Sequence, residues 1–244
     1  MADRVKRVTT AARFLIAGAL FISVPSLANA QRMTSPRASI KHTADFPVRE
    51  FDNRAWRDAD EINVTTYWNG KTAPAGRGFK VRLLWSDEAL YVRFEANQSE
   101  PLIVSDAPDL TKKTMHLWDR DVCEIFLAAG RAEPRKYLEF EVAPTGEWID
   151  LAIDLTGDKR KTDWEFKSGM ESAAKIEKDR VTMTMKLPWR AWGRSPKSNE
   201  TWAGNLFRCV GKDPDRGYLA WSPTMTAEPA YHVPEKFGEF VFVK

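Results

Sequence analysis

Three glutamates in two short apolar runs are the residues with the clearest chemical potential. Glu124 lies within residues 122–127 (VCEIFL), and Glu139 and Glu141 lie within residues 137–142 (YLEFEV). Side chains alternate between the two faces of a strand, so the apolar residues of each run would pack on one side. The sequence therefore predicts that the three carboxylates gather on the other face of a sheet.

A group of carboxylates on a sheet has several uses. The plainest is a solvated face with cross-strand ion pairs. The group could also line a groove that hydrogen-bonds sugar hydroxyls, form a pair of glycosidase acids, or hold calcium. Arg208, within residues 205–210 (NLFRCV), is expected to face away from Cys209 and to neutralise the glutamates. The residues alone leave these alternatives open.

Two aromatic residues outside the alternating runs favour the sugar-binding groove. Trp118 lies in the polar stretch 116–121 (HLWDRD), and Tyr231 lies in the segment before Pro234. The apolar face of a pyranose stacks on such rings while its hydroxyls pair with polar side chains. The alternative is that each ring covers the edge of the core.

The elements that must position these residues are short β-rich runs separated by turns. No segment has the pattern of a long amphipathic helix, and residues 97–117 form a long polar loop. The pattern predicts an all-β fold, an antiparallel β-sandwich of jelly-roll type with about ten strands. The main expected strands are residues 62–68, 79–85, 89–96, 122–127, 137–142, 148–153, 181–187, 205–210, 218–221 and 237–243.

The first thirty residues have the pattern of a signal peptide. Basic residues precede an apolar run at 14–24, and Ala28-Asn29-Ala30 provides a small-x-small cleavage site. An uncleaved anchor is the alternative. We expect export to a periplasm or to the cell exterior, a flexible lead-in over residues 31–44, and a binding domain over residues 45–244.

Removal of that segment changes the charge balance of the chain. It holds four of the 37 Lys and Arg and one of the 34 Asp and Glu, so 33 of each remain. A neutral mature chain gives no electrostatic argument for nucleic-acid binding. We also expect no membrane insertion after signal cleavage.

The remaining motifs concern three other kinds of site: a disulfide, a structural zinc site and a haem site. Cys123 and Cys209 could form one disulfide or be two small buried residues, and no Cys/His spacing of a structural zinc site is present. A haem-binding electron-transfer domain is a second alternative function, for which Met115, His116 and His232 are the available ligands. Met115 and His116 are adjacent and would point to opposite faces of a strand, so they would not both bind one iron.

Six sequence blocks together resemble the family-nine carbohydrate-binding modules, and most closely the exported stand-alone proteins of that type. The resemblance covers residues 45–244 and implies a β-sandwich without catalytic residues. The blocks, in chain order, are VRLLWSDEALYVRFEA, LWDRDVCEIFL, YLEFEVAPTGEWIDL, KLPW, YLAWSPT and VPEKFGEFVF.

The resemblance also implies a binding site. The two rings that clamp a sugar in those modules fall on Trp118 and Tyr231, and the acid of the WxxDxxE block falls on Glu124. A further polar contact falls near Asn97. Glu141 stands where the modules use an arginine, so Arg208 or His232 would have to supply the missing donor.

The expected partner is a poly- or oligosaccharide, such as xylan or cellulose, bound at its end or along its length in support of polysaccharide degradation. No cofactor is implied, with calcium as an alternative. A weakly hydrolytic glycosidase, with Glu124 and Glu141 as its acids, is the other functional class, and a structural interaction module is a further one.

Overall fold

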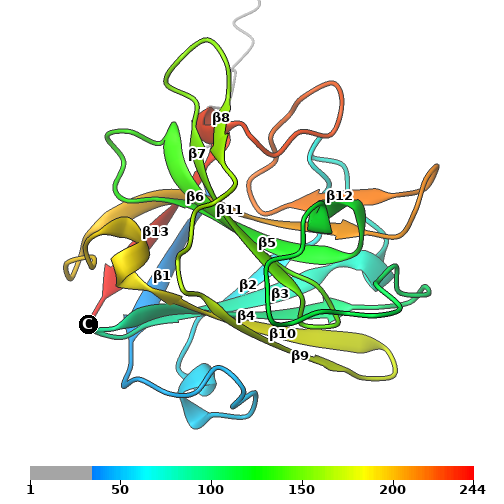
Figure 1. Cartoon of the computed structure of the whole chain (residues 1–244), viewed down its shortest axis with the longest axis horizontal. Coiled ribbons are helices and arrows are strands. Elements are labelled where there is room, and N and C mark those ends of the chain that lie inside the picture. The colour runs from blue at the N-terminus through cyan, green and yellow to red at the C-terminus, as the bar shows by residue number, and fades with distance from the viewer. Residues whose placement is uncertain (1–34) are drawn as a thin grey trace, which may run out of the picture. The chain divides into compact units, whose positions relative to one another are not determined.

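The computed structural model describes residues 35–244, which form strands joined by loops and short 3-10 turns (Figure 1). The predicted signal peptide, residues 1–30, lies outside the described residues. The strands are β1 (Arg37–His42), β2 (Glu61–Val64), β3 (Phe79–Trp85), β4 (Ala89–Asn97), β5 (Val122–Ala128), β6 (Lys136–Val142), β7 (Trp148–Asp154), β8 (Lys161–Asp163), β9 (Glu171–Ile176), β10 (Arg180–Pro188), β11 (Thr201–Val210), β12 (Gly217–Ala220) and β13 (Gly238–Val243).

Helical structure in the described part of the chain is limited to single 3-10 turns. They are η1 (Arg54–Arg57), η2 (Ala75–Arg77), η3 (Leu117–Asp119), η4 (Trp189–Trp192) and η5 (Pro234–Lys236). The turn η4 follows Pro188, whose fixed φ suits the start of a helical turn. Across the described residues, no helix has both the length and the apolar character needed to span a membrane.

The strands form one curled sheet whose two ends face each other as the layers of a sandwich. The order along the sheet is β8-β7-β6-β5-β11-β13-β1-β3-β4-β10-β9, with β12 paired to β11 and β2 paired to β3. Most neighbours are antiparallel, but β1 runs parallel to both β13 and β3. The predicted all-β sandwich is therefore confirmed, with a mixed rather than a purely antiparallel sheet.

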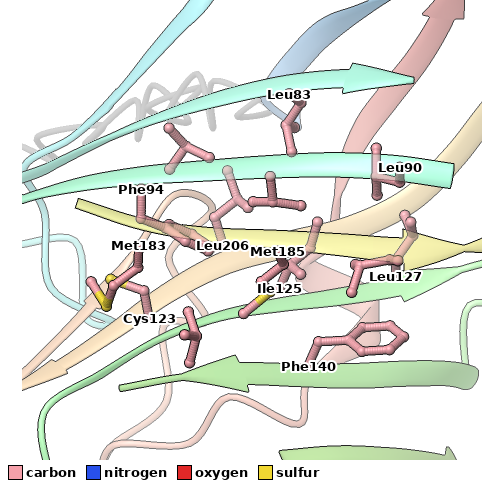
Figure 2. Packing of buried hydrophobic residues seen from close by; sticks show 14 of the residues in the cluster. Leu83, Leu90, Phe94, Cys123, Ile125, Leu127, Phe140, Met183, Met185 and Leu206 are labelled. Carbon is pink, nitrogen blue, oxygen red and sulfur yellow. The ribbon is translucent and has the colours of Figure 1, made fainter. Parts of the chain in front are cut away.

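The main core lies between the two layers, and strand alternation selects the residues that enter it. The face of β10 that begins with Val181 and ends with Leu187 is buried there, as is the face of β6 that carries Phe140. Figure 2 shows residues of β3, β4 and β10 meeting residues of β5, β6 and β11. The labelled residues are Leu83, Leu90, Phe94, Cys123, Ile125, Leu127, Phe140, Met183, Met185 and Leu206.

The start of the domain differs from the sequence prediction. Residues 37–42 belong to the predicted flexible lead-in, yet they form β1, which joins β13 to β3 and so links the two layers. Ile40 is completely buried, and the His42 ring packs edge-on against Trp85. The prediction of a flexible lead-in is therefore wrong for these residues, because backbone pairing on both edges orders a segment whose own residue pattern is weak.

The layer that contains β5, β6, β7 and β11 is covered on both faces. Its outer face carries a second apolar cluster that includes Phe126, Leu151 and Phe207. Leu117, from the loop before β5, and Phe237, from the segment before β13, pack onto this cluster. Residues that alternate away from the main core therefore enter a second enclosed space and not bulk water.

The two cysteines lie on opposite faces of this layer and are free thiols. Cys123 is paired with Arg208 across the β5–β11 ladder and faces the main core, whereas Cys209 belongs to the outer cluster. The disulfide alternative is therefore excluded, and the prediction of two buried small residues is confirmed.

The long loop between β4 and β5 is fastened to the sheet by a buried ion pair. Lys113 Nζ lies 2.7 Å from Asp150 Oδ1 and donates hydrogen bonds to the carbonyl oxygens of Asp150, Trp164 and Phe166. The Asp150 side chain is only 1% exposed, and its other oxygen accepts from Ser168. This contact connects the loop to β7 and to the segment that follows β8.

We expect Lys113→Met to destabilise the fold by about 3 kcal/mol, because removing one partner leaves the buried Asp150 carboxylate without a countercharge. Chemical denaturation of the two proteins measures the change. Lys112→Met is the matched control, since Lys112 is 76% exposed and should leave the denaturation midpoint unchanged. Equal stability of the Lys113→Met and Lys112→Met variants would contradict the structural role of the pair.

Candidate functional site

A pocket of about 560 Å³ lies on the outer face of the doubly covered layer. We call it the glutamate pocket. Strands β5, β6 and β7 form its floor, and the segment around η3, the residues after β7, and the segment before η5 form its walls. Its lining residues are Trp118, Asp119, Glu124, Phe126, Glu139, Glu141, Leu151, Ile153, Arg160, Thr162, Trp164, Cys209, Asp213, Arg216, Tyr218, Pro229, Ala230, Tyr231 and His232.

The floor of the glutamate pocket carries the three glutamates predicted to share a face. Glu124 of β5 lies directly opposite Glu141 of β6, and Glu139 is two residues earlier on β6. One carboxylate oxygen of each residue lies within 4.8 Å of those of the other two. Glu124 is 2% exposed, Glu141 is 0% exposed and Glu139 is 4% exposed, so the alternative of a solvated sheet face is excluded.

These carboxyl groups are buried with few ion pairs or hydrogen bonds to offset the loss of hydration. Among the described residues, neither Glu124 nor Glu141 forms an ion pair, and both oxygens of Glu141 and one of Glu139 lack a hydrogen-bond partner. Burial raises the pKa of Glu124 and Glu141 well above 4.5, and the neighbouring carboxylates raise it further. Burial also raises the pKa of Glu139 to about 7.

The neighbouring His232 and Cys209 do not supply a charge. His232 Nδ1 is 3.9 Å from a Glu139 oxygen and 2.6 Å from the Tyr137 hydroxyl, and burial lowers the pKa of His232 to about 3. The Cys209 thiol donates to Glu124 Oε1 at 3.6 Å, and burial raises the pKa of this thiol well above 9. At neutral pH, both side chains are therefore uncharged.

The two predicted ring residues both line the pocket, and each is half-buried. Tyr231 stacks on Phe207 with ring centroids 4.0 Å apart, and its hydroxyl donates to the carbonyl oxygen of Arg208. The Trp118 ring lies 6.0 Å from that of Trp164 and 5.1 Å from that of His116. One ring is thus held flat against the sheet, while the other belongs to a group at the pocket wall.

Arg216 fixes the short turn η3 that presents Trp118. Its guanidinium donates to the carbonyl oxygens of Trp118, Asp119 and Arg120 at 2.6, 2.8 and 2.7 Å. It also lies over the Tyr218 ring at 5.5 Å. The positive charge of Arg216 is therefore directed to backbone carbonyls and an aromatic face, and no glutamate of the floor pairs with it.

The structure brings five of the seven predicted site residues into the pocket. They are Trp118, Glu124, Glu141, Tyr231 and His232. Asn97 and Arg208 do not line it. Arg208 is buried on the main-core face of β11 and donates to the carbonyl oxygens of Arg77 and Asn97 and to Gln98 Oε1. The exposed Asn97 donates its amide to the Ala75 carbonyl.

The expectation that Arg208 neutralises the glutamates is therefore wrong. It assumed that Cys209 faces the main core together with Cys123. In fact the register pairs Phe207 with Glu124, so Phe207 and Cys209 share the glutamate face and Arg208 points to the other side. The pocket also contains residues that are absent from the predicted site, chiefly Arg160, Trp164, Arg216 and Tyr218. They come from segments far apart in the chain, and no local pattern marks them.

Of the groups named for a haem site, only His232 lines the pocket. Met115 is 45% exposed, and His116 is also exposed, with a left-handed backbone at φ 57°. The chemistry that the pocket brings together is instead a set of aromatic rings beside buried carboxyl groups.

Comparisons with known proteins point to one type of domain. The family described as carbohydrate family 9 binding domain-like matches residues 50–244. A protein of Arthroderma benhamiae named "Extracellular protein" is 25% identical over 199 residues, which represent 72% of this chain and 87% of that protein.

Solved structures share the fold. A protein of Bacteroides uniformis, described as a candidate carbohydrate-binding protein, superposes with a TM-score of 0.68 at 16% identity and covers 86% of this chain and 100% of its own. A family 9 carbohydrate binding module of Caldicellulosiruptor kristjanssonii, in complex with cellotriose, gives 0.61 at 16% identity, covering 85% and 94%. The complex with glucose gives 0.59 at the same identity, covering 85% and 95%.

The buried carboxyl groups predict a pH-dependent stability. The pKa of Glu139 is about 7 in the folded protein against an ordinary value of 4.5. A carboxyl whose pKa is raised by folding stabilises the protein below the unfolded pKa, and this contribution is lost as pH rises through the folded pKa. In a buffer with a chelator of divalent cations, we expect the Tm to fall as pH rises from about 4.5 past about 7.

Glu141→Gln should remove part of this effect, since the amide is neutral at every pH. We expect it to raise the Tm relative to the unsubstituted protein by roughly 2–4 °C at about pH 8, with a smaller change at about pH 5. Thermal unfolding at the two pH values measures the difference, and Glu235→Gln, which alters an exposed carboxyl, is the control. An equal change in Tm at both pH values would show that the charge of Glu141 is not responsible.

Proposed function

Because the chain belongs to the family of carbohydrate family 9 binding domain-like proteins, we propose that it is an exported, non-catalytic protein that binds a poly- or oligosaccharide in the glutamate pocket. The observation that carries the proposal is the composition of this pocket. It joins several aromatic rings to buried carboxyl groups and arginines in one concave site, and those are the groups that stack on a sugar and pair with its hydroxyls.

In the proposed complex, the rings of Trp118 and Tyr231 provide the stacking surfaces. One face of Tyr231 is already covered by Phe207, so the opposite face is the one left for a ligand. Trp164, which is 39% exposed and lies beside Trp118, extends the apolar wall. Arg160, which is exposed and lines the pocket, is the proposed hydrogen-bond donor to the saccharide in place of Arg208, which does not line it.

The carboxyl groups of the floor supply the polar contacts. Glu124 and Glu139 are the more accessible of the three, at 2% and 4% exposed. Their raised pKa values favour the protonated form, which can donate a hydrogen bond as well as accept one. A sugar hydroxyl needs both kinds of partner, so this pair suits a neutral saccharide.

The proposal includes export and a role beside degradative enzymes. Support for export comes from the signal-peptide pattern of residues 1–30 and from the relative named "Extracellular protein". Support for the saccharide class comes from the family 9 module that was solved with cellotriose and with glucose. We propose a β-linked glucan or xylan chain as the ligand, with the chain end in the pocket.

Calorimetric titration of the protein with cellotriose and xylotriose tests the proposal, after a glycan array has identified other candidate ligands. We expect Trp118→Ala to weaken binding by roughly tenfold, because the stacking contact is lost. Ile176→Ala is the control, since Ile176 is 52% exposed on β9 and is not a lining residue of the pocket. Unchanged affinity in the Trp118→Ala variant, or no saccharide ligand on the array, would refute the proposal.

The same samples separate binding from hydrolysis. We expect no turnover of reducing-end-labelled oligosaccharides during prolonged incubation. Turnover that Glu124→Gln abolishes would instead identify the protein as a glycosidase.

A further inference from the structure

The three glutamates of the pocket floor are more deeply buried than contact with a saccharide requires. Glu141 is 0% exposed, and neither of its carboxylate oxygens has a hydrogen-bond partner in the structure. One carboxylate oxygen of Glu139 is likewise buried and has no hydrogen-bond partner. A buried carboxyl without a partner is costly, so this arrangement needs a positive charge or protons in the space that the oxygens share.

The surrounding charges do not meet that need. The residues that line the pocket include five carboxylates, with Asp119 and Asp213 beside the three glutamates, but only two arginines. Arg216 is engaged with backbone carbonyls, and Arg160 is exposed. The pocket therefore carries an excess of negative charge whenever its carboxyl groups are ionised.

We propose that Glu124, Glu139 and Glu141 bind a calcium ion at the floor of the glutamate pocket. The oxygens of the three residues lie within 4.8 Å of one another. Calcium–oxygen distances of 2.3–2.6 Å place two oxygens on opposite sides of the ion about 4.6–5.2 Å apart, so oxygens that all lie within 4.8 Å of one another fit inside a calcium coordination shell. Mg²⁺ dehydrates reluctantly and is usually held by only one or two protein carboxylates, so three carboxylates at one site favour calcium.

The chemistry of the donors also favours calcium. All three are carboxylate oxygens, which are hard ligands preferred by calcium. Among the described residues, the cluster includes no histidine nitrogen and no cysteine sulfur, which are the usual ligands of a structural zinc site.

Three carboxylates supply three to six oxygen ligands, depending on whether each binds through one oxygen or two. Calcium takes about six to eight, so water or the hydroxyls of a pocket ligand would complete the shell. The site does not depend on the saccharide proposal, because the protein supplies the three charged ligands itself. With calcium bound, Glu124 and Glu139 are ionised and only accept hydrogen bonds from sugar hydroxyls, whereas the protonated, donating form belongs to the calcium-free pocket.

Calcium titration of the chelator-treated protein in the absence of saccharide tests the proposal. At about pH 8, we expect calcium at a hundredfold excess over its Kd to raise the Tm by about 5–10 °C. Glu141→Gln and Glu139→Gln should lose most of this shift, and calorimetry should show one fewer bound calcium in each variant than in the unsubstituted protein. Glu235→Gln, an exposed carboxyl outside the pocket, should retain both.

Two results would overturn the calcium site. One is the absence of any calcium-dependent shift in the unsubstituted protein, which would mean that protons alone neutralise the cluster. The other is an undiminished shift and stoichiometry in both glutamine variants, which would place the bound calcium elsewhere.

If a glutamine variant does not fold, Glu124→Asp shortens one ligand while keeping the charge and should weaken calcium binding at least tenfold. Failure of the calcium site leaves the saccharide titration unaffected, so the two proposals fail separately.

Discussion

The constraint on which this molecule depends is that one layer of its sandwich is buried on both faces. The inner face of β5, β6 and β11 packs in the main core, and the outer face carries the second apolar cluster beneath two loop segments. Strand alternation must then send every second residue into an enclosed space. When those residues are glutamates, the same backbone geometry that builds the core also builds a pocket with carboxyl groups at its floor.

The loops that cover the outer face are themselves held by charged side chains. Lys113 forms an ion pair with a buried aspartate, and Arg216 donates hydrogen bonds to three carbonyl oxygens in η3 and in the residue that follows it. Both contacts join segments distant in sequence. The pocket wall is thus organised by a few long polar side chains, while apolar packing provides most of the burial beneath it.

Much of the fold could be predicted from the sequence because it depends on local alternation. The inward faces of β5 and β6 follow directly from the alternation of their apolar residues, and those predictions are confirmed. The sequence did not reveal that residues 37–42 form a strand, because hydrogen bonds to β13 and β3, and not the side chains of β1 itself, hold β1 in place. A short polar strand between two others has little local signal.

The burial of the glutamates and the position of Arg208 were harder to infer for a related reason. Val122 and Phe126 share the face of Glu124, and Phe207 shares the face of Cys209. When apolar residues occur at both the odd and the even positions of a strand, both faces of that strand are covered. That signal was present in VCEIFL and NLFRCV, but only the three-dimensional structure identifies the loops that provide the cover.

The parallel strand β1 also affects how the chain reaches its native state. β1 is the first strand of the described chain, and its partner β13 is the last, so their pairing has the largest sequence separation in the sheet. During synthesis, the edges that meet at β1 stay open until β13 has been made. Closure of the sandwich must therefore wait for β13, and a chain truncated before β13 would expose unpaired edges in the middle of its sheet.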